Sequence, residues 1–388
     1  MELVEWAPIL RDRTDAELRL RPHRIEDVEA ILEQCTDPLT QRWSKVPSPY
    51  LRMHAEEFVR TRPVEWAAGV RLSFAVEYRG RFAGSVALRP ADPLGAAAEV
   101  GFGLAPWARG RGLATRAVRL LLQWGFDLLP LQLVRWDAIE GNWASRRVAW
   151  SLGFAITGPM PAALVQRGEP RSAWSGSLAA GEPMRPRTAW FDVPELTGRS
   201  ASGSPVLLRD ASDGDLERIM EGCADPQSQR WLPMLPSPYR IEHAIAYLRQ
   251  CAEDAASGAG IHLSIDHESG LAGRVSLIVD RGQGEIGYWT HPQARGLGLT
   301  SAAVRALSEH ALALPEDGGL GLRRLLIRAA SENFGSQHVA LAAGYRLSGL
   351  DRNGEQLRDG TVLDMYRFDR LPADASRTAG PAGPSSSA

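Results

Sequence analysis

The stretch EVGFGLAPWARGRGLATRAVR, residues 99–119, decides the fold. Residues 99–104 alternate between the two faces of a strand, and 113–128 carry apolar residues at helical spacing, so the stretch predicts a strand followed by a helix. The turn at 109–112, Arg-Gly-Arg-Gly, opens that helix. Glycines let several N–H groups face inward, and the unpaired amides of the first helical turn join them in a concave anion site.

The chemistry of this turn excludes two common nucleotide sites. The turn lacks the Gly-Lys-Ser/Thr ending of a nucleoside-triphosphate loop. It also lacks the third glycine of the dinucleotide fingerprint, because Thr115 stands there, and it follows the fourth expected strand instead of an early one. Arg109 and Arg111 add positive charge at the start of a helix whose dipole also attracts anions. The turn therefore predicts a site for a different phosphate-bearing group.

The deciding stretch recurs in the second half of the chain as EIGYWTHPQARGLGLTSAAVR, residues 285–305. Two further matches flank it in the same order. EQCTDPLTQRW (33–43) matches EGCADPQSQRW (221–231), and the Asn-x-x-Ser at 142–145 matches the one at 333–336. Three ordered matches about 190 residues apart indicate duplication of a whole domain, because a solenoid repeat is much shorter.

Length and composition set the expected domain boundaries. The 388 residues suggest two domains of about 100–200 residues each. Residues 182–203 are rich in Gly, Pro and Ser, which is typical of a linker. We therefore expect an N-terminal domain at 1–181 and a C-terminal domain at 204–371. The remaining residues, 372–388, lack apolar periodicity and predict a disordered tail.

Bulk properties exclude several classes of partner. A formal net charge of −2 gives no electrostatic reason to expect nucleic acid or an anionic membrane. The chain shows neither a signal peptide nor an apolar stretch near the roughly 18 residues of a membrane span. The three cysteines have neither metal-ligand spacing nor the pattern of a disulfide framework. We expect a cytoplasmic protein that holds no metal.

Periodicity within the first copy predicts the order β-α-α-β-β-β-α-β-α-β. The expected strands are 18–21, 72–78, 82–88, 99–104, 131–139 and 173–178, and the expected helices are 26–34, 54–62, 113–128 and 142–152. A hairpin and a strand–helix–strand crossover place antiparallel and parallel pairs in one sheet. The fold class is therefore mixed α/β.

The glycine-rich turn resembles the pyrophosphate loop of the GCN5-related N-acetyltransferase (GNAT) superfamily, whose signature is Gln/Arg-x-x-Gly-x-Gly/Ala. Arg109, Gly112 and Ala114 satisfy the signature in copy one. Copy two has the arginine and the glycine but departs at Thr300, where the small residue is expected. The strand before the turn and the Asn-x-x-Ser-x-x-Val segment after it resemble the ribosomal-protein N-terminal acetyltransferase branch. The resemblance implies two tandem GNAT-like acyl-CoA N-acyltransferase domains, each a mostly antiparallel twisted sheet flanked by helices, with acetyl-CoA as co-substrate.

The resemblance also implies the composition of the cofactor site. Besides the loop, it includes a backbone N–H near the end of the strand, which stabilises the oxyanion, and an asparagine that contacts the pantetheine arm or an ordered water. That asparagine fits a helix N-cap equally well. The candidate cofactor-binding residues are Leu104, Arg109, Gly110, Arg111, Gly112, Ala114, Thr115 and Asn142 in copy one, and Arg295, Gly296, Gly298, Thr300 and Asn333 in copy two.

Glu99 and Glu285 begin the strands that lead to the two loops. The period of two puts Glu99 on the glycine face of its strand, beside an open space. A carboxylate there can take the proton that an amine must lose before it attacks a thioester, and the resemblance implies this role. The alternative is a surface glutamate at a strand edge. Many family members protonate the leaving thiolate with a tyrosine, but Ala149 stands at that position, so Ser145 is the candidate acid.

Together these residues predict a transferase that moves acetyl from acetyl-CoA to a primary amine. The acceptor is a protein N-terminus or a small molecule, attack is direct through a tetrahedral intermediate, and copy one is the better candidate catalyst. The alternatives are a non-catalytic acyl-CoA-binding or scaffolding protein, and nucleotide-dependent chemistry. Trp43 and Tyr50 either line an acceptor pocket or fix helices to the sheet. The chain is expected to be a monomer or a homodimer.

Overall fold

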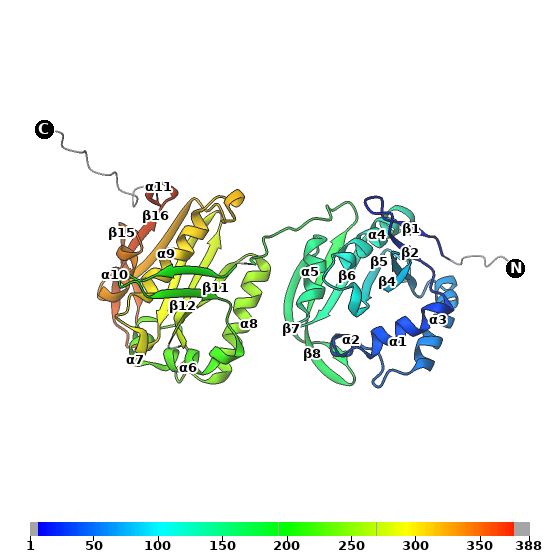
Figure 1. The fold of residues 1–388 in the computed structure, drawn as a ribbon, viewed down its shortest axis with the longest axis horizontal. Coiled ribbons are helices and arrows are strands. Elements are labelled where there is room, and N and C mark those ends of the chain that lie inside the picture. The colour runs from blue at the N-terminus through cyan, green and yellow to red at the C-terminus, as the bar shows by residue number, and fades with distance from the viewer. Residues whose placement is uncertain (1–6, 193, 269, 376–388) are drawn as a thin grey trace. The chain divides into compact units, whose positions relative to one another are not determined.

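The computed structural model describes residues 7–192, 194–268 and 270–375 and divides the chain into two compact units, Met1–Arg187 and Thr188–Ala388 (Figure 1). Each unit contains one eight-stranded sheet with helices packed on it. The prediction of two mixed α/β domains, each mostly antiparallel, is confirmed.

The first unit follows the predicted order with additions at its edges. Its strands are β1 (Leu10–Arg11), β2 (Leu18–Arg21), β3 (Leu72–Tyr78), β4 (Arg81–Pro90), β5 (Ala97–Leu104), β6 (Leu133–Ile139), β7 (Ala155–Gln166) and β8 (Glu169–Ala179). Its helices are α1 (Val28–Thr36), α2 (Pro38–Trp43), α3 (Arg52–Ala67), α4 (Leu113–Leu128) and α5 (Trp143–Ser151). The sheet order is β1-β2-β3-β4-β5-β6-β8-β7, and β5 runs parallel to β6.

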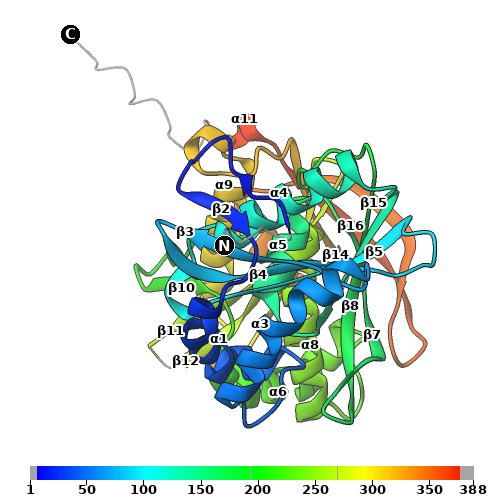
Figure 2. The ribbon, with the colours of Figure 1, turned by 90° about the vertical axis from the view of Figure 1, so that its right-hand side faces the viewer.

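Helices cover both faces of this sheet, and each face has its own core (Figure 2). Phe74 of β3 belongs to the larger core, which α4 and α5 cover. Ala75, the next residue, belongs to a second cluster under α1 and α3. Because successive strand residues point to opposite faces, α4 and α5 lie on one side of the sheet and α1 and α3 on the other.

The second unit repeats this plan. Its strands are β9 (Leu196–Arg199), β10 (Pro205–Arg209), β11 (Gly260–His267), β12 (Gly270–Asp280), β13 (Gln283–Thr290), β14 (Arg324–Ala330), β15 (Arg346–Gln356) and β16 (Val362–Arg370). Its helices are α6 (Leu216–Ala224), α7 (Pro226–Trp231), α8 (Ile241–Ser257), α9 (Leu299–Leu312), α10 (Phe334–Ala342) and α11 (Pro372–Ala375). The sheet order is β15-β16-β14-β13-β12-β11-β10-β9, and β13 runs parallel to β14.

Strand β9 lies within 182–203, the segment that composition marks as a linker. It pairs antiparallel with β10, as β1 pairs with β2 in the first unit. The partner strand and helix α9, which β9 contacts, supply a tertiary environment that overrides the Gly- and Ser-rich composition. Of the tail that we expected to be disordered, 372–388, the first four residues form α11, and 376–388 lie outside the described residues.

Both sheets open between their two parallel strands. β5 pairs with β6 through three residues, and the last pair joins Glu99 to Arg135, although β5 continues to Leu104. In the second unit the last pair joins Glu285 to Leu326. In each unit this opening begins at the candidate catalytic glutamate.

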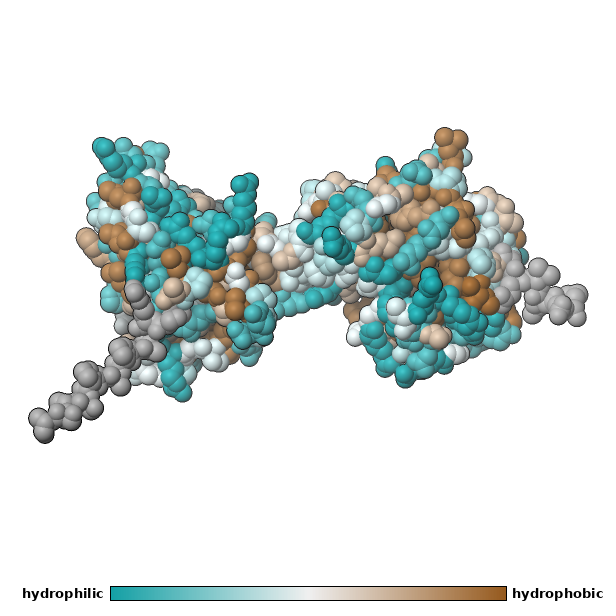
Figure 3. Space-filling model, turned by 90° about the horizontal axis from the view of Figure 1, so that it is seen from above, coloured by the Kyte–Doolittle hydropathy of each residue, from teal (hydrophilic) through white to brown (hydrophobic). Residues whose placement is uncertain are grey.

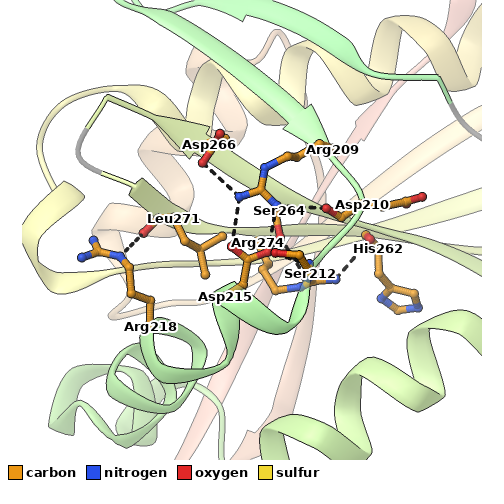
Figure 4. Close-up of polar contacts among 10 residues, drawn as sticks. All are labelled: Arg209, Asp210, Ser212, Asp215, Arg218, His262, Ser264, Asp266, Leu271 and Arg274. Carbon is orange, nitrogen blue, oxygen red and sulfur yellow. Dashed lines mark hydrogen bonds and ion pairs between the residues drawn. The ribbon is translucent and has the colours of Figure 1, made fainter.

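An ion-pair network, buried in the first unit and partly exposed in the second, joins the start of the first helix of each unit to its sheet. In the first unit, Arg21 Nη2 lies 2.7 Å from Asp27 Oδ1, and Arg21 Nε lies 2.6 Å from Glu77 Oε2. In the second unit, Arg209 makes the equivalent contacts with Asp215 and Asp266 (Figure 4). The network joins the residue that precedes α1 to strands β2 and β3.

None of the helices in the described part of the chain combines the length and the apolar character that a bilayer span requires. On the face seen in Figure 3, hydrophilic and hydrophobic residues are interspersed on both units. Within the described ranges, no group of three or more His, Cys, Asp or Glu side chains is placed to hold a metal ion.

Candidate functional site

The predicted anion loop forms as a turn with two left-handed glycines. Gly110 has φ 71° and Gly112 has φ 70°, a region that residues with a Cβ rarely adopt. Gly112 is the N-cap of α4, and no side chain of the described residues caps this helix. By contrast, Asn142 caps α5 by accepting from the Ser145 amide at 3.2 Å. The first-turn amides of α4, including that of Ala114, therefore remain available to an anion.

The signature arginine makes its contacts within the protein. Arg109 Nη2 lies 2.7 Å from Asp37 Oδ2 and 2.9 Å from Thr40 Oγ1, and its Nε donates to the Leu104 carbonyl at 3.2 Å. Arg295 pairs with Asp225 in the same way. The guanidinium therefore ties α2 to the end of β5 and to the loop, and it supports the anion site by position and by charge.

Asp37 has two tasks, because its carboxylate also caps α2 by accepting from the Thr40 amide at 2.9 Å. Burial alone would raise the pKa of Asp37, but the hydrogen bonds from Arg109 and Thr40 hold it below its ordinary value. A lowered folded-state pKa means that the pair stabilises the fold above the ordinary aspartate pKa of about 3.9 and loses this effect as the pH falls through the folded value.

We therefore expect Asp37→Asn to lower stability modestly near neutral pH. Asparagine keeps the N-cap, so the loss is that of a partly exposed ion pair, about 1 kcal/mol or a Tm decrease of about 2–4 °C. Scanning calorimetry at pH 7 and at falling pH checks this, and the gap to wild type should close in acid. Asp225→Asn is the matched change in the second unit. Equal melting at pH 7 would contradict the prediction.

The second loop arginine is freer to reach a ligand. Arg111 is exposed, with its guanidinium 5.8 Å from the centroid of the Trp107 ring. Leu297, also exposed, replaces it in the second unit. Of the two loops, the one in the first unit therefore presents more positive charge to an anion.

The two candidate catalytic glutamates lie at the point where the sheets open. Glu99 Oε1 is 2.8 Å from Arg89 Nη2, and the Glu99 side chain is 41% exposed. Glu285 pairs with Arg328 at 2.9 Å and is 45% exposed. The prediction that Glu99 lies beside an open space fits this exposure, and Arg89 fixes the carboxylate next to the bare backbone of Gly101.

Backbone amides beyond Glu99 point into the opening. The Ala105 amide donates to Ala83 of β4, so odd-numbered residues of β5 bond to β4 and even-numbered residues face β6. The ladder with β6 ends at Glu99. The amides of Phe102 and Leu104 therefore face the gap, and Phe102 is a further donor that the sequence analysis did not name.

The candidate acid Ser145 lies at the start of α5, where its Oγ accepts from the Trp136 indole at 3.0 Å. Its counterpart Ser336 contacts the hydroxyl of Tyr288 at 2.9 Å. Burial raises the pKa of Tyr288 to about 12. Sequence reasoning missed this phenol, although aligning the two copies pairs Tyr288 with Phe102 and would have revealed it.

The repeated Trp and Tyr residues fix helices to the sheet. Tyr50 is buried beside Cys35, and burial raises the pKa of the Cys35 thiol to about 11. Gln41 Nε2 donates to the Cys35 carbonyl at 2.6 Å. The Trp43 ring packs on Gly141, where an added Cβ would lie 3.2 Å from the ring. Tyr50 therefore has a packing role, while Trp43 lies next to the residue that caps α5.

The second loop departs from the first around Gly298. Thr300, in the place of Ala114, is buried and its Oγ1 lies 2.6 Å from Thr290 Oγ1. The Cβ of Ser200 lies 3.6 Å from the position of a Cβ on Gly298, whereas no heavy atom of the described residues lies within 4 Å of the same position on Gly112. In both units the glutamate stands where the sheet opens and the loop follows the end of the same strand, and there is more space above the first loop.

Comparison with known proteins identifies similar sequences in both halves of the chain. The family profile described as "Acetyltransferase (GNAT) domain" matches residues 17–155 and 206–346. A putative ribosomal N-acetyltransferase, YdaF of Bacillus subtilis (strain 168), is 35% identical over 81 residues, which are 21% of this chain and 44% of that protein. The ribosomal-protein-serine acetyltransferase of Escherichia coli (strain K12) is 37% identical over 75 residues, 19% of this chain and 39% of that protein. The matches thus span about two fifths of these curated relatives.

The chain was also compared with solved structures. The RimL ribosomal L7/L12 alpha-N-protein acetyltransferase in complex with coenzyme A aligns with a TM-score of 0.41 and 18% identity, over 44% of this chain and 98% of that chain.

Proposed function

Because this chain belongs to the acetyltransferase (GNAT) family, we propose that it transfers an acetyl group from acetyl-CoA to a primary amine of a protein N-terminus or a small molecule. The observation that carries the proposal is the start of α4, which has no side-chain cap and begins at the exposed, left-handed Gly112 beside the exposed Arg111. The names of both curated relatives support acetyl transfer, and the name of the Bacillus subtilis protein supports transfer to nitrogen.

In the proposed reaction the diphosphate of acetyl-CoA binds the first-turn amides of α4, and the pantetheine arm enters the opening between β5 and β6. Glu99 accepts a proton from the amine, directly or through water, and the amine nitrogen attacks the thioester carbon. The amides of Phe102 and Leu104 stabilise the oxyanion. The C–N bond forms, the C–S bond breaks, and the thiolate takes a proton, for which Ser145 is the candidate donor.

We assign catalysis to the first unit. It has the second loop arginine, Ala114 at the close-approach position and an unobstructed Gly112. In the second unit Thr300 replaces Ala114 and bonds to Thr290, and Ser200 lies within van der Waals contact of a Cβ placed on Gly298. These contacts favour a second candidate role for that unit, a structural or ligand-binding domain without turnover.

One experiment tests the proposal on the full chain. Titration calorimetry with CoA should show saturable binding, and incubation with acetyl-CoA and a panel of N-terminal peptides and small amines should release free CoA thiol and yield acetylated product. Binding of CoA without acetylation of any amine would favour the non-catalytic alternative, and absence of CoA binding would refute both.

A further inference from the structure

The first unit contains a buried glutamine whose side-chain carbonyl is unsatisfied among the described residues. Gln34, on α1, is 7% exposed, and its Oε1 is buried with no hydrogen-bond donor among the described residues. A buried acceptor left without a donor costs about 1–3 kcal/mol, and most buried polar groups in folded proteins are satisfied. We therefore expect this oxygen to accept a hydrogen bond from a bound molecule.

The Gln34 side chain lies against the glycine face of β5. A Cβ added to Gly103 would lie 3.0 Å from Gln34 Nε2. Gly103 stands beyond the last pair between β5 and β6, so this contact is at the opened part of the sheet. Any side chain at position 103 would displace Gln34.

The same face carries the proposed base. Glu99, Gly101 and Gly103 share it by the period of two. The carboxylate of Glu99 is held by Arg89, whose Nη2 lies 4.0 Å from the position of a Cβ on Gly101. From Gly101 to Gly103 is about 6.6 Å along the strand. A molecule whose amine meets Glu99 can therefore present a second polar group, about three bonds further along its chain, to Gln34.

The second unit fills this space with protein. Gly222 takes the place of Gln34 and Trp289 takes the place of Gly103. A Cβ added to Gly222 would lie 2.3 Å from the Trp289 ring, so the indole occupies the side of β13 that Gln34 faces on β5. The larger residue is on the helix in the first unit and on the strand in the second, so the two positions share one space. In the first unit the polar side chain of Gln34 lies in this space, and in the second unit the indole of Trp289 fills it.

We propose that Gln34 binds the acceptor, its Oε1 accepting a hydrogen bond from an N–H of the acceptor next to the reacting amine. In an N-terminal peptide this donor is the first peptide N–H. Gln34 thus acts in specificity and Glu99 in proton transfer, and Trp289 excludes an acceptor from the corresponding place in the second unit. The inference rests on the proposed function, because it concerns the acceptor of that same reaction.

The test combines a protein change with a substrate change. Gln34→Met keeps the length of the side chain and removes the carbonyl. The acceptors are two N-terminal peptides that differ by a methyl group on the first peptide nitrogen. We expect Gln34→Met to lower kcat/KM for the unmethylated peptide about fivefold, through KM, because a neutral hydrogen bond contributes about 1 kcal/mol. Methylation should cost wild type a similar factor and cost the variant little.

The outcomes separate a binding role from a structural one. If methylation lowers kcat/KM equally in wild type and Gln34→Met, Gln34 does not contact this N–H and the inference fails. A variant that melts earlier but keeps the methyl discrimination shows a packing role and also overturns it. Gln41→Met on the nearby α2 is a control whose contacts lie within the protein, and its methyl discrimination should match wild type. If wild type acetylates small amines but neither peptide, the inference is also overturned. If wild type acetylates no amine at all, the result contradicts the proposed function instead.

Discussion

Glu99→Gln is expected to lower kcat for acetyl transfer by about 10²–10⁴-fold while the affinity for acetyl-CoA stays unchanged. Glutamine keeps the size of the side chain and can still accept from Arg89, which now lies 2.8 Å from the carboxylate. What it loses is the ability to take a proton. The loss should therefore appear in turnover, measured by release of CoA thiol, and leave calorimetric binding as it was.

The pH dependence of this variant distinguishes proton transfer from positioning. The pKa of an α-amino acceptor is about 7.7–8.0, so above about pH 9 most of the acceptor is already deprotonated and needs no general base. The deficit of Glu99→Gln should shrink as the pH rises past the pKa of the acceptor. A deficit that stays constant with pH would show that Glu99 orients the substrate and does not remove its proton.

Glu285→Gln is the matched control, since Glu285 has the same place in the second sheet and a comparable ion pair with Arg328. With catalysis in the first unit, this variant should turn over at the wild-type rate. Loss of activity in Glu285→Gln with full activity in Glu99→Gln would move the reaction to the second unit, where Tyr288 then stands as the hydroxyl beside Ser336.

Local patterns predicted the elements around the site well. The expected helix at 113–128 coincides with α4. Its apolar residues recur at helical spacing, and the glycine turn before it marks its N-terminus. Strand β7 was missed. It contains two prolines and is mostly exposed, so it lacks the alternation that marks a half-buried strand, and its place at the sheet edge is what tolerates the prolines.

Contacts between distant residues were harder to foresee. The ion pair of Arg109 with Asp37 joins residues far apart in the chain, and only the recurrence of both residues as Arg295 and Asp225 hinted at it. The exchange of Gln34 and Gly103 for Gly222 and Trp289 becomes informative only once the structure shows that the two positions touch. A single sequence records which residues repeat, whereas the fold decides which of them meet.

The loop itself offers the second large effect. Gly112→Asp is expected to weaken CoA binding about a hundredfold or more, because a carboxylate would stand where the diphosphate meets the first-turn amides. Loss of one or two charge-assisted hydrogen bonds, at about 1.5–3 kcal/mol each, corresponds to that factor at 1.4 kcal/mol per tenfold. Titration calorimetry with CoA measures it, and added salt should reduce the difference by screening the charge.

The strength of this test is that Gly112 has room for a side chain. No heavy atom of the described residues lies within 4 Å of an added Cβ there, and aspartate and asparagine are among the side chains that tolerate left-handed backbone. Gly112→Asn therefore controls for shape and backbone strain without the charge, and it should retain most of the affinity. Gly298→Asp applies the same charge to the second loop. If Gly112→Asp binds CoA as wild type does and Gly298→Asp does not, the cofactor belongs to the second unit; if Gly112→Asn loses as much as Gly112→Asp, backbone strain explains the loss and the anion site at α4 is unsupported.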